Sequence, residues 1–184
     1  HIVTIEGEVY PAAVNETIKA TLQNYGRPKF MVLMTETFEG RRNTPGMTVT
    51  ELTMMQIMGN AGFEFVDSQM TQQLVQRENA RMANAMMGNI SEDVQNLLLN
   101  DVGAEVIIIG QTSTSDQTAA ATQYARNMQS KQAIVNLKAI DVYTGRVLAT
   151  VSSNAPGMHI DANTASKMAI QRCLESIKVL GKND

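Results

Sequence analysis

The sequence has one cysteine, no tryptophan and four prolines. A single cysteine cannot form an intrachain disulfide, so no disulfide framework is expected and the redox compartment is left open. No apolar run approaches the roughly 20 residues that a membrane-spanning helix needs. Basic residues are also too few to favour nucleic acid, because the formal net charge is −3 and the pI is about 5.4. A chain of 184 residues with these properties predicts one globular domain with no nucleic-acid partner.

Sequence motifs of nucleotide and metal enzymes are missing as well. The chain has no G-x-G-x-x-G, no G-x-x-x-x-G-K, no C-x-x-C and no H-E-x-x-H. The only histidines are His1 and His159. The residues available for a Ser-His-Asp catalytic triad are Ser152 or Ser153, His159 and Asp161. Because Asp161 stands just before a helical segment, helix capping is the better interpretation of this set.

Three further groups of side chains could carry chemistry. Glu36 and Glu39 flank the end of a strand, where catalytic carboxylate pairs occur, but nothing else in the sequence converges on them. Cys173 falls on the apolar side of the last helical segment, which favours packing over nucleophilic attack. The 13 methionines, such as Met54 and Met82, are expected to fill the core or a subunit interface. We therefore predict no enzyme activity and no catalytic, cofactor-binding or metal-binding residues.

The stretch 103–153 organises the rest of the chain. Residues 105–109 form an apolar β-branched run, typical of a strand covered on both faces. Residues 131–142 alternate between apolar and polar, which indicates a strand with one face toward a core. The sequence Tyr143-Thr144-Gly145 predicts a turn, after which residues 146–152 return as an antiparallel partner.

Other elements follow from periodicity and capping signals. We expect strands over 2–10, 29–37 and 63–66. Helices are expected over 11–25, 48–60 and 67–87, from Ser91 up to a stop at Gly103, and from Asp161 or Asn163 onward. Between them we expect a loop over 38–46 that exposes Arg41 and Arg42, a polar link over 111–130 and a turn over 154–157. The order is β-α-β-α-β-α-α-β-β-β-α. It predicts an α/β fold of the mixed α+β kind, with a single mixed β-sheet flanked by helices.

The first part of the chain forms a separate unit in this scheme. In residues 11–25, Val14, Ile18, Leu22 and Tyr25 repeat at helical spacing. We expect residues 1–27 to be a strand-helix prefix that packs on the core of a domain formed by residues 28–184.

The hairpin residues resemble a known family. GAEVIIIG, followed by QAIVNLKAIDVYTGRVLATV and a helix, is similar to the CsgG-like family, which includes the curli-secretion lipoprotein, the amino-terminal domain of TolB, the middle domain of FlgT and LpoB. Upstream, KFMVLMTETFEG and GFEFVDS resemble the first two core strands of that family. The resemblance covers residues 29–180. It implies a TolB amino-terminal-domain-like fold in a periplasmic module that binds envelope proteins.

The pore of the curli-type member is not implied. Each membrane hairpin needs about twice the 9 to 11 alternating residues of one membrane strand. Residues 111–130 have Tyr124 as their only aromatic and no sustained alternation, and residues 154–160 leave room for a turn alone. We therefore expect no insertion of this chain into a membrane.

The sequence thus predicts a non-enzymatic protein-binding or assembly module of the bacterial cell envelope. It would lie in the periplasm, with a lipid anchor upstream of His1 attaching it to the outer membrane. The partners would be envelope proteins and further copies of the chain, and no cofactor is expected. Two alternatives stay open: a subunit of a ring-forming secretion, flagellar or curli-type assembly, and a hydrolase with an unrecognised site.

Overall fold

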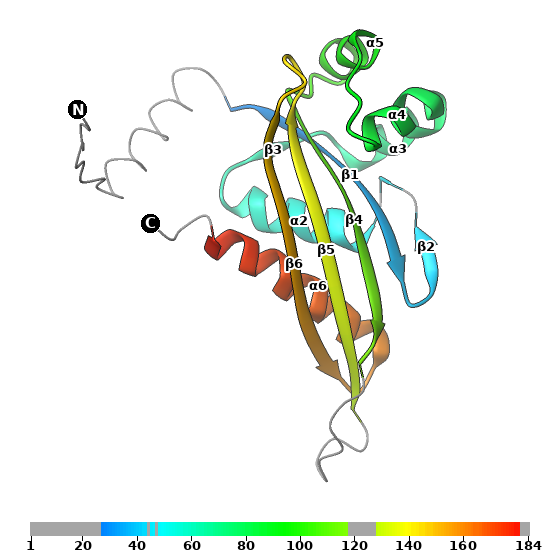
Figure 1. Ribbon diagram of the computed structural model, residues 1–184, viewed down its shortest axis with the longest axis vertical. Coiled ribbons are helices and arrows are strands. Elements are labelled where there is room, and N and C mark those ends of the chain that lie inside the picture. The colour runs from blue at the N-terminus through cyan, green and yellow to red at the C-terminus, as the bar shows by residue number, and fades with distance from the viewer. Residues whose placement is uncertain (1–26, 44, 47, 118–127, 181–184) are drawn as a thin grey trace, which may run out of the picture.

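The computed structural model of the chain describes residues 27–43, 45–46, 48–117 and 128–180 (Figure 1). These residues form one mixed sheet of six strands: β1 (Lys29–Phe38), β2 (Arg41–Asn43), β3 (Glu64–Phe65), β4 (Val106–Asp116), β5 (Gln129–Asp141) and β6 (Val147–His159). The helices are α2 (Val49–Asn60), α3 (Ser68–Arg77), α4 (Asn79–Met86), α5 (Glu92–Asn96), its π-helical continuation η1 (Leu97–Asp101) and α6 (Ala162–Leu180). The predicted α/β class, with a single mixed sheet flanked by helices, is confirmed.

The strand order is β2-β1-β4-β5-β6, and β3 pairs with β1 on the same side as β2. β1 runs parallel to β3 and β4, which requires helical crossovers in the first half of the chain. The pairs β4–β5 and β5–β6 are antiparallel, as the hairpin pattern predicts.

Each face of the sheet carries its own core. Figure 1 shows α2 and α6 behind the sheet and α3 to α5 gathered at one end of the other face. Val32, Ile108 and Val135 pack toward α2 and α6. Leu33 and Ile109 pack toward α3, α4, α5 and η1. Because Ile108 and Ile109 point to opposite faces, the apolar run at the start of β4 is buried on both, as predicted.

The β5–β6 turn has the predicted chemistry. Gly145 has a φ of +66°, and its N–H donates to the carbonyl of Asp141 at 2.8 Å. The Asp141 carboxylate also accepts from the backbone N–H of Tyr143 at 2.8 Å. An L-residue at position 145 would be strained at that φ, so glycine is the residue that suits the turn.

Two segments predicted as connections belong to strands. Residues 111–116 extend β4, since Thr112 and Thr114 point inward while Gln111, Ser113 and Ser115 point to solvent. A pattern of threonine against serine has almost no hydropathy contrast, and the sequence therefore conceals the alternation. The middle of the predicted polar link, residues 118–127, lies outside the described residues.

The expected turn over 154–157 is wrong, because β6 runs through it to His159. Pro156 is tolerated there because β6 is the last strand of the sheet. Among the described residues, no neighbouring strand needs a backbone N–H from its outer edge, so a residue without an N–H fits. Gly157 marks a close approach of a helix. A Cβ at this position would lie 2.0 Å from the carbonyl oxygen of Ala165 in α6.

Two further predictions need correction. The loop over 38–46 contains β2, in which Arg41 and Arg42 pair with β1 while their side chains stay exposed. The single helix over 67–87 is interrupted at Glu78, where φ is −114° and ψ is 39°. At the interruption, the Glu78 carboxylate lies 3.3 Å from Nε of Arg77 and 3.4 Å from Nη1 of Arg81 at the surface.

The other helix ends follow the sequence more closely. Thr48 and Glu51 form the predicted capping box at the start of α2. The helix from Ser91 forms as α5 and ends as η1, before Gly103. The predicted strand over 2–10, the helix over 11–25 and their packing on the core lie outside the described residues.

Candidate functional site

One face of the sheet is covered over only part of its length, and we call the uncovered part the open face. Its residues alternate along three strands and are exposed or half-buried: Gln111, Ser113 and Ser115 of β4, Gln132, Ile134, Asn136 and Lys138 of β5, and Thr150, Ser152 and Asn154 of β6. In Figure 1 no labelled helix crosses this part of the strands on the viewer's side. The open face is therefore a broad surface of mostly uncharged polar side chains.

Strand pairing holds these side chains in rows. Asn136 lies opposite Gln111 on one side and opposite Ser152 on the other. The Ser152 hydroxyl donates to Oδ1 of Asn136 at 2.7 Å. Such cross-strand contacts limit the rotamers of short polar groups, so the row presents donors and acceptors in fixed positions.

A pocket of about 510 Å³ lies where the open face meets the end of α4. Its walls include Arg42, Met86, Met87, Gln111 and Lys138. Its charged lining residues are both cations, and the described residues supply no ion-pair partner to either. In a chain with a net charge of −3, this local positive field favours an anionic group.

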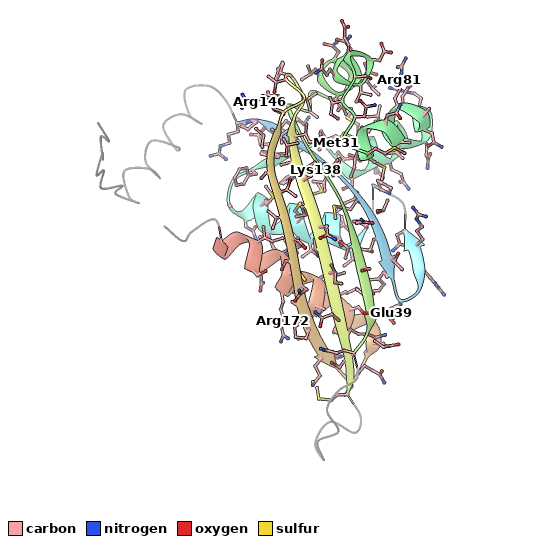
Figure 2. All side chains as sticks on the ribbon, viewed as in Figure 1. Met31, Glu39, Arg81, Lys138, Arg146 and Arg172 are labelled. Carbon is pink, nitrogen blue, oxygen red and sulfur yellow. The ribbon has the colours of Figure 1, made fainter. Side chains whose placement is uncertain are left out.

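Lys138 is placed where the backbone also favours a cation (Figure 2). Its Nζ would be 3.6 Å from a Cβ on Gly88, just after the carboxyl end of α4. The carbonyl groups at a helix carboxyl end carry partial negative charge. A cation near this helix end is therefore stabilised by its position.

The two carboxylates singled out in the sequence do not come together in one site. Glu36 is buried and binds the start of α2: its Oε2 accepts from the backbone N–H of Thr50 at 2.8 Å and from the Thr50 hydroxyl at 2.7 Å. Its Oε1 accepts from the N–H of Val49 at 3.2 Å. The Glu36 carboxylate therefore caps the amino end of α2, which is a structural role.

A second buried carboxylate, Glu51, joins α2 to the sheet. Its Oε1 accepts from the backbone N–H of Met34 at 2.8 Å, on the side of β1 that faces away from β4. Its Oε2 accepts from the N–H groups of Gly46 and Thr48, each at 2.9 Å. Burial raises the pKa of Glu51, and these backbone donors oppose that rise. The carboxylate therefore accepts the hydrogen bond that a neighbouring strand would otherwise accept from Met34 of β1.

Glu39, just after the carboxyl end of β1, belongs to a charged cluster (Figure 2). Its Oε2 lies 2.8 Å from Nζ of Lys131, which is also 2.7 Å from Oδ1 of Asp116, and its Oε1 accepts from the hydroxyl of Ser166. The bond from Lys131 lowers the pKa of Glu39, and the bonds to Asp116 and Glu39 raise the pKa of Lys131. Lys131 is thus held protonated, which removes it as a general base for Ser166.

The Ser-His-Asp set is not assembled. Ser152 lies on the open face, whereas Ser153 lies on the other face, 2.7 Å from the hydroxyl of Ser176. Both are at least six residues from His159 along one strand, which is about 20 Å. Asp161 accepts from the N–H and the hydroxyl of Thr164, each at 2.7 Å. Asp161 caps α6, as the capping interpretation expects.

Cys173 is fully buried, and burial raises the pKa of its thiol. Its Sγ donates a weak hydrogen bond to the carbonyl oxygen of Ala133 at 3.5 Å, and the side chain packs in the core with Ala169 and Ile170. Met54 and Met82 fill the two cores, whereas Met87 is exposed at the pocket. Within the described ranges, no three His, Cys, Asp or Glu side chains are grouped to hold a metal ion. None of the helices described is both long and apolar enough to cross a membrane.

Sequence reasoning missed the pocket. The alternation in β5 indicated an outward polar row, and it contained Asn136 and Lys138. It could not show that Arg42, nearly 100 residues earlier, would line the same hollow. That pairing depends on β1 and β4 running side by side, which brings β2 to the same sheet.

No protein-family model matches the chain, and no curated protein matches it in sequence. Solved structures do. Lipoprotein GNA1162 from Neisseria meningitidis has a TM-score of 0.52 at 11% identity, over 85% of this chain and 99% of that one. The hypothetical protein CT253 from Chlamydia trachomatis has a TM-score of 0.50 at 11% identity, over 85% and 96%.

LpoB, a member of the family that the hairpin sequence resembles, is less similar in structure. Its carboxyl-terminal domain from Escherichia coli has a TM-score of 0.34 at 16% identity, over 79% of this chain and 96% of that one. The first two likenesses show the fold alone, because identity is so low. The chain therefore shares its α/β fold with two bacterial proteins, one of which is a lipoprotein.

Proposed function

We propose that this chain is a non-enzymatic protein-binding module of the bacterial cell envelope, of the CsgG-like kind, and that the open face is its contact surface. The observation that carries the proposal is the open face itself. It is a sheet surface with ordered polar rows and a cationic pocket at one end. Surfaces that keep such groups exposed on rigid strands suit recognition of another protein.

The partner would present a carboxylate. Arg42 and Lys138 favour an acidic side chain or a chain terminus in the pocket, and Met86 and Met87 supply an adaptable apolar wall. Along the rows, Gln111 and Asn136 offer both donors and acceptors. Charge would guide the approach of the partner, while the rows would fix its register.

The carboxylates considered for catalysis, all within the described residues, have structural partners. Glu36 and Glu51 hold α2, and Glu39 and Lys131 neutralise each other. Asp161 caps α6. A hydrolase is therefore the least supported of the three functions considered.

Periplasmic location is part of the proposal, with a lipid anchor upstream of His1 at the outer membrane. Two observations support it: the fold shared with a lipoprotein, and a hairpin sequence that resembles the CsgG-like family. An anchor before residue 1 would leave the sheet free to meet proteins of the envelope. The expected partners are such proteins, and the expected cofactors are none.

Site-specific photocrosslinking tests the open face. A benzoylphenylalanine in place of Asn136 should crosslink one discrete protein in envelope extracts of the source bacterium. The same group in place of Gln171, which is exposed on α6, is the matched control and should not capture it. Lys138→Glu should reduce the Asn136 crosslink severalfold, and Lys167→Glu on α6 should leave it unchanged. Equal capture from both positions would refute the open face as the contact surface.

A second function is favoured by β6. This strand has 13 residues, and within the described part of the chain no strand pairs with its outer edge. A long edge strand is a template for pairing with another chain. We therefore keep as the alternative a subunit of a ring-forming assembly, in which β6 lies at the contact between subunits. Light scattering tests it, because a monomer at every concentration up to millimolar would contradict a ring.

A further inference from the structure

An apolar groove lies on the covered face of the sheet, between α2 and α6. It has a volume of about 320 Å³, and every residue that lines it is apolar. Its walls include Met54 and Met58 of α2, Phe63, Ala149 of β6, and Leu174 and Ile177 of α6. We call it the α2–α6 groove. It is on the opposite side of the sheet from the open face, so it is independent of the proposed function.

The groove is open to solvent at its rim. Phe63 is 37% exposed, and Ala149 is exposed although it belongs to the face that the helices cover. Polar side chains would be expected on a rim that stays wet. An all-apolar hollow left in water is instead typical of a surface that another apolar group covers.

We infer that the α2–α6 groove is covered by residues 11–25 of the same chain, bound as an amphipathic helix. The first argument is the place where that segment joins the domain. Arg27 Nη1 donates to the carbonyl oxygen of Gly62 at 2.6 Å. Gly62 stands between Ala61 and Phe63, which both line the groove. The chain therefore enters the domain at the rim of the groove.

The second argument is reach. Tyr25 is two residues from Arg27, so it lies within about 7 Å of it even in an extended chain. A helix over residues 11–25 would be about 22 Å long. That length is about twice the diameter of a helix, so the segment can extend from the rim at Gly62 along the groove.

The third argument is the pattern of the segment. Val14, Ile18, Leu22 and Tyr25 form one apolar stripe, while Glu16, Lys19 and Asn24 fall elsewhere on the helix. The stripe supplies the apolar group that the groove lacks, and the polar side would face water. Bound in this way, the segment adds a third helix beside α2 and α6.

Two neighbouring residues of β6 give a direct test in the full-length chain. Ala149 and Thr150 are both exposed, but Ala149 lines the α2–α6 groove and Thr150 lies on the open face. Single Ala149→Cys and Thr150→Cys proteins are reacted with a maleimide dye, and the parent gives the background of the buried Cys173. We expect the thiol at 149 to react at least tenfold more slowly than the thiol at 150. Equal rates would overturn the inference, because they mean that nothing covers the groove.

A second substitution identifies what covers it. In the Ala149→Cys protein, Leu22→Asp should raise the labelling rate toward that of the thiol at 150, and Asn24→Asp should not. Protection that Leu22→Asp leaves intact would overturn the assignment to residues 11–25. Dilution separates the segment of the same chain from that of a second copy: we expect a rate independent of protein concentration. A rate that rises on dilution would assign the groove to a second copy and overturn the inference as stated.

Discussion

The two faces of the sheet are formed by the same strands, yet helices cover most of the strand length on one face and only one end of it on the other. In β5, Val135 is fully buried against α2 and α6, whereas the adjacent Ile134 is 43% exposed on the open face. Both are β-branched apolar residues, so their burial is decided by the neighbours on each face. The composition of a strand therefore does not fix how much of it meets water.

The boundary of the open face follows a change within single rows of side chains. Along β1, Met31 and Leu33 are buried under α3 to η1, and the next residue of the same row is Thr35. Along β4 the same change occurs between Ile109 and Gln111. Helical cover ends where the row becomes polar, because a helix would gain little from burying hydroxyl and amide groups. The edge of the helical cover thus coincides with the change from apolar to polar side chains in each row, although single apolar residues such as Ile134 lie beyond it.

The largest expected effect concerns the bond between α2 and the covered face. Glu51→Ala should lower the free energy of unfolding by roughly 3–5 kcal/mol, because three buried N–H groups lose their acceptor. Urea denaturation measures it. Glu64→Ala removes an exposed carboxylate and should change stability by less than about 0.5 kcal/mol. A similar small loss for Glu51→Ala would show that α2 does not depend on its carboxylate.

The contrast between the faces is tested directly by Val135→Ala and Ile134→Ala. We expect a loss of about 2 kcal/mol for Val135→Ala, which creates a cavity in the core. Ile134→Ala should cost less than about 1 kcal/mol, because its side chain is already partly in water. Both are read from urea midpoints. Equal losses would mean that something covers the open face in solution.

The turn at Gly145 joins β5 to β6, and both strands contribute side chains to both faces of the sheet. Gly145→Val should destabilise by about 1–2 kcal/mol, because a β-branched residue is strained at a φ of +66°. Thermal unfolding measures the loss. Tyr143→Val, an exposed position in the same turn, is the control and should leave the midpoint nearly unchanged. An unchanged midpoint for Gly145→Val would contradict the positive φ.

Much of this fold could be predicted from the sequence. The run 105–109, the alternation after Lys131 and the turn at Gly145 gave the sheet centre correctly, because apolar contrast and glycine are strong local signals. The extension of β4 and the second half of β6 were missed. There the strands carry serine, threonine, Pro156 and Gly157, which are typical of loops when read locally.

The candidate site was less accessible to sequence reasoning. The fates of Glu36 and Glu39 depend on residues far away in the chain, such as Thr50 and Lys131, and local spacing does not record those contacts. The cationic pocket likewise needs Arg42 and Lys138 from different strands. Long-range pairing in the sheet, which a single sequence shows poorly, creates these neighbours.

The smallest expected effect concerns the cluster of Glu39 and Lys131 at the lower end of the sheet. The fold lowers the pKa of Glu39 below its usual 4.5, so the native carboxyl binds a proton less readily than the unfolded one. Its contribution to stability is therefore present above pH 4.5 and is lost as the pH falls through the folded pKa. Lys131 affects stability at high pH. Because its pKa is raised above 10.5, its contribution is lost only as the pH rises beyond that value.

Glu39→Gln isolates the acidic half of this behaviour. Near neutral pH the variant should be less stable than the parent by about 1 kcal/mol, since Asp116 still pairs with Lys131 and part of Glu39 is exposed. The difference should stay constant between pH 5 and 8 and shrink below pH 4.5, in urea titrations at each pH. The titration of Glu51 is common to both proteins and cancels in the difference. A stability difference that does not change with pH would show that Glu39 contributes through the shape and hydrogen bonds of its side chain, and that its charge adds nothing to the fold.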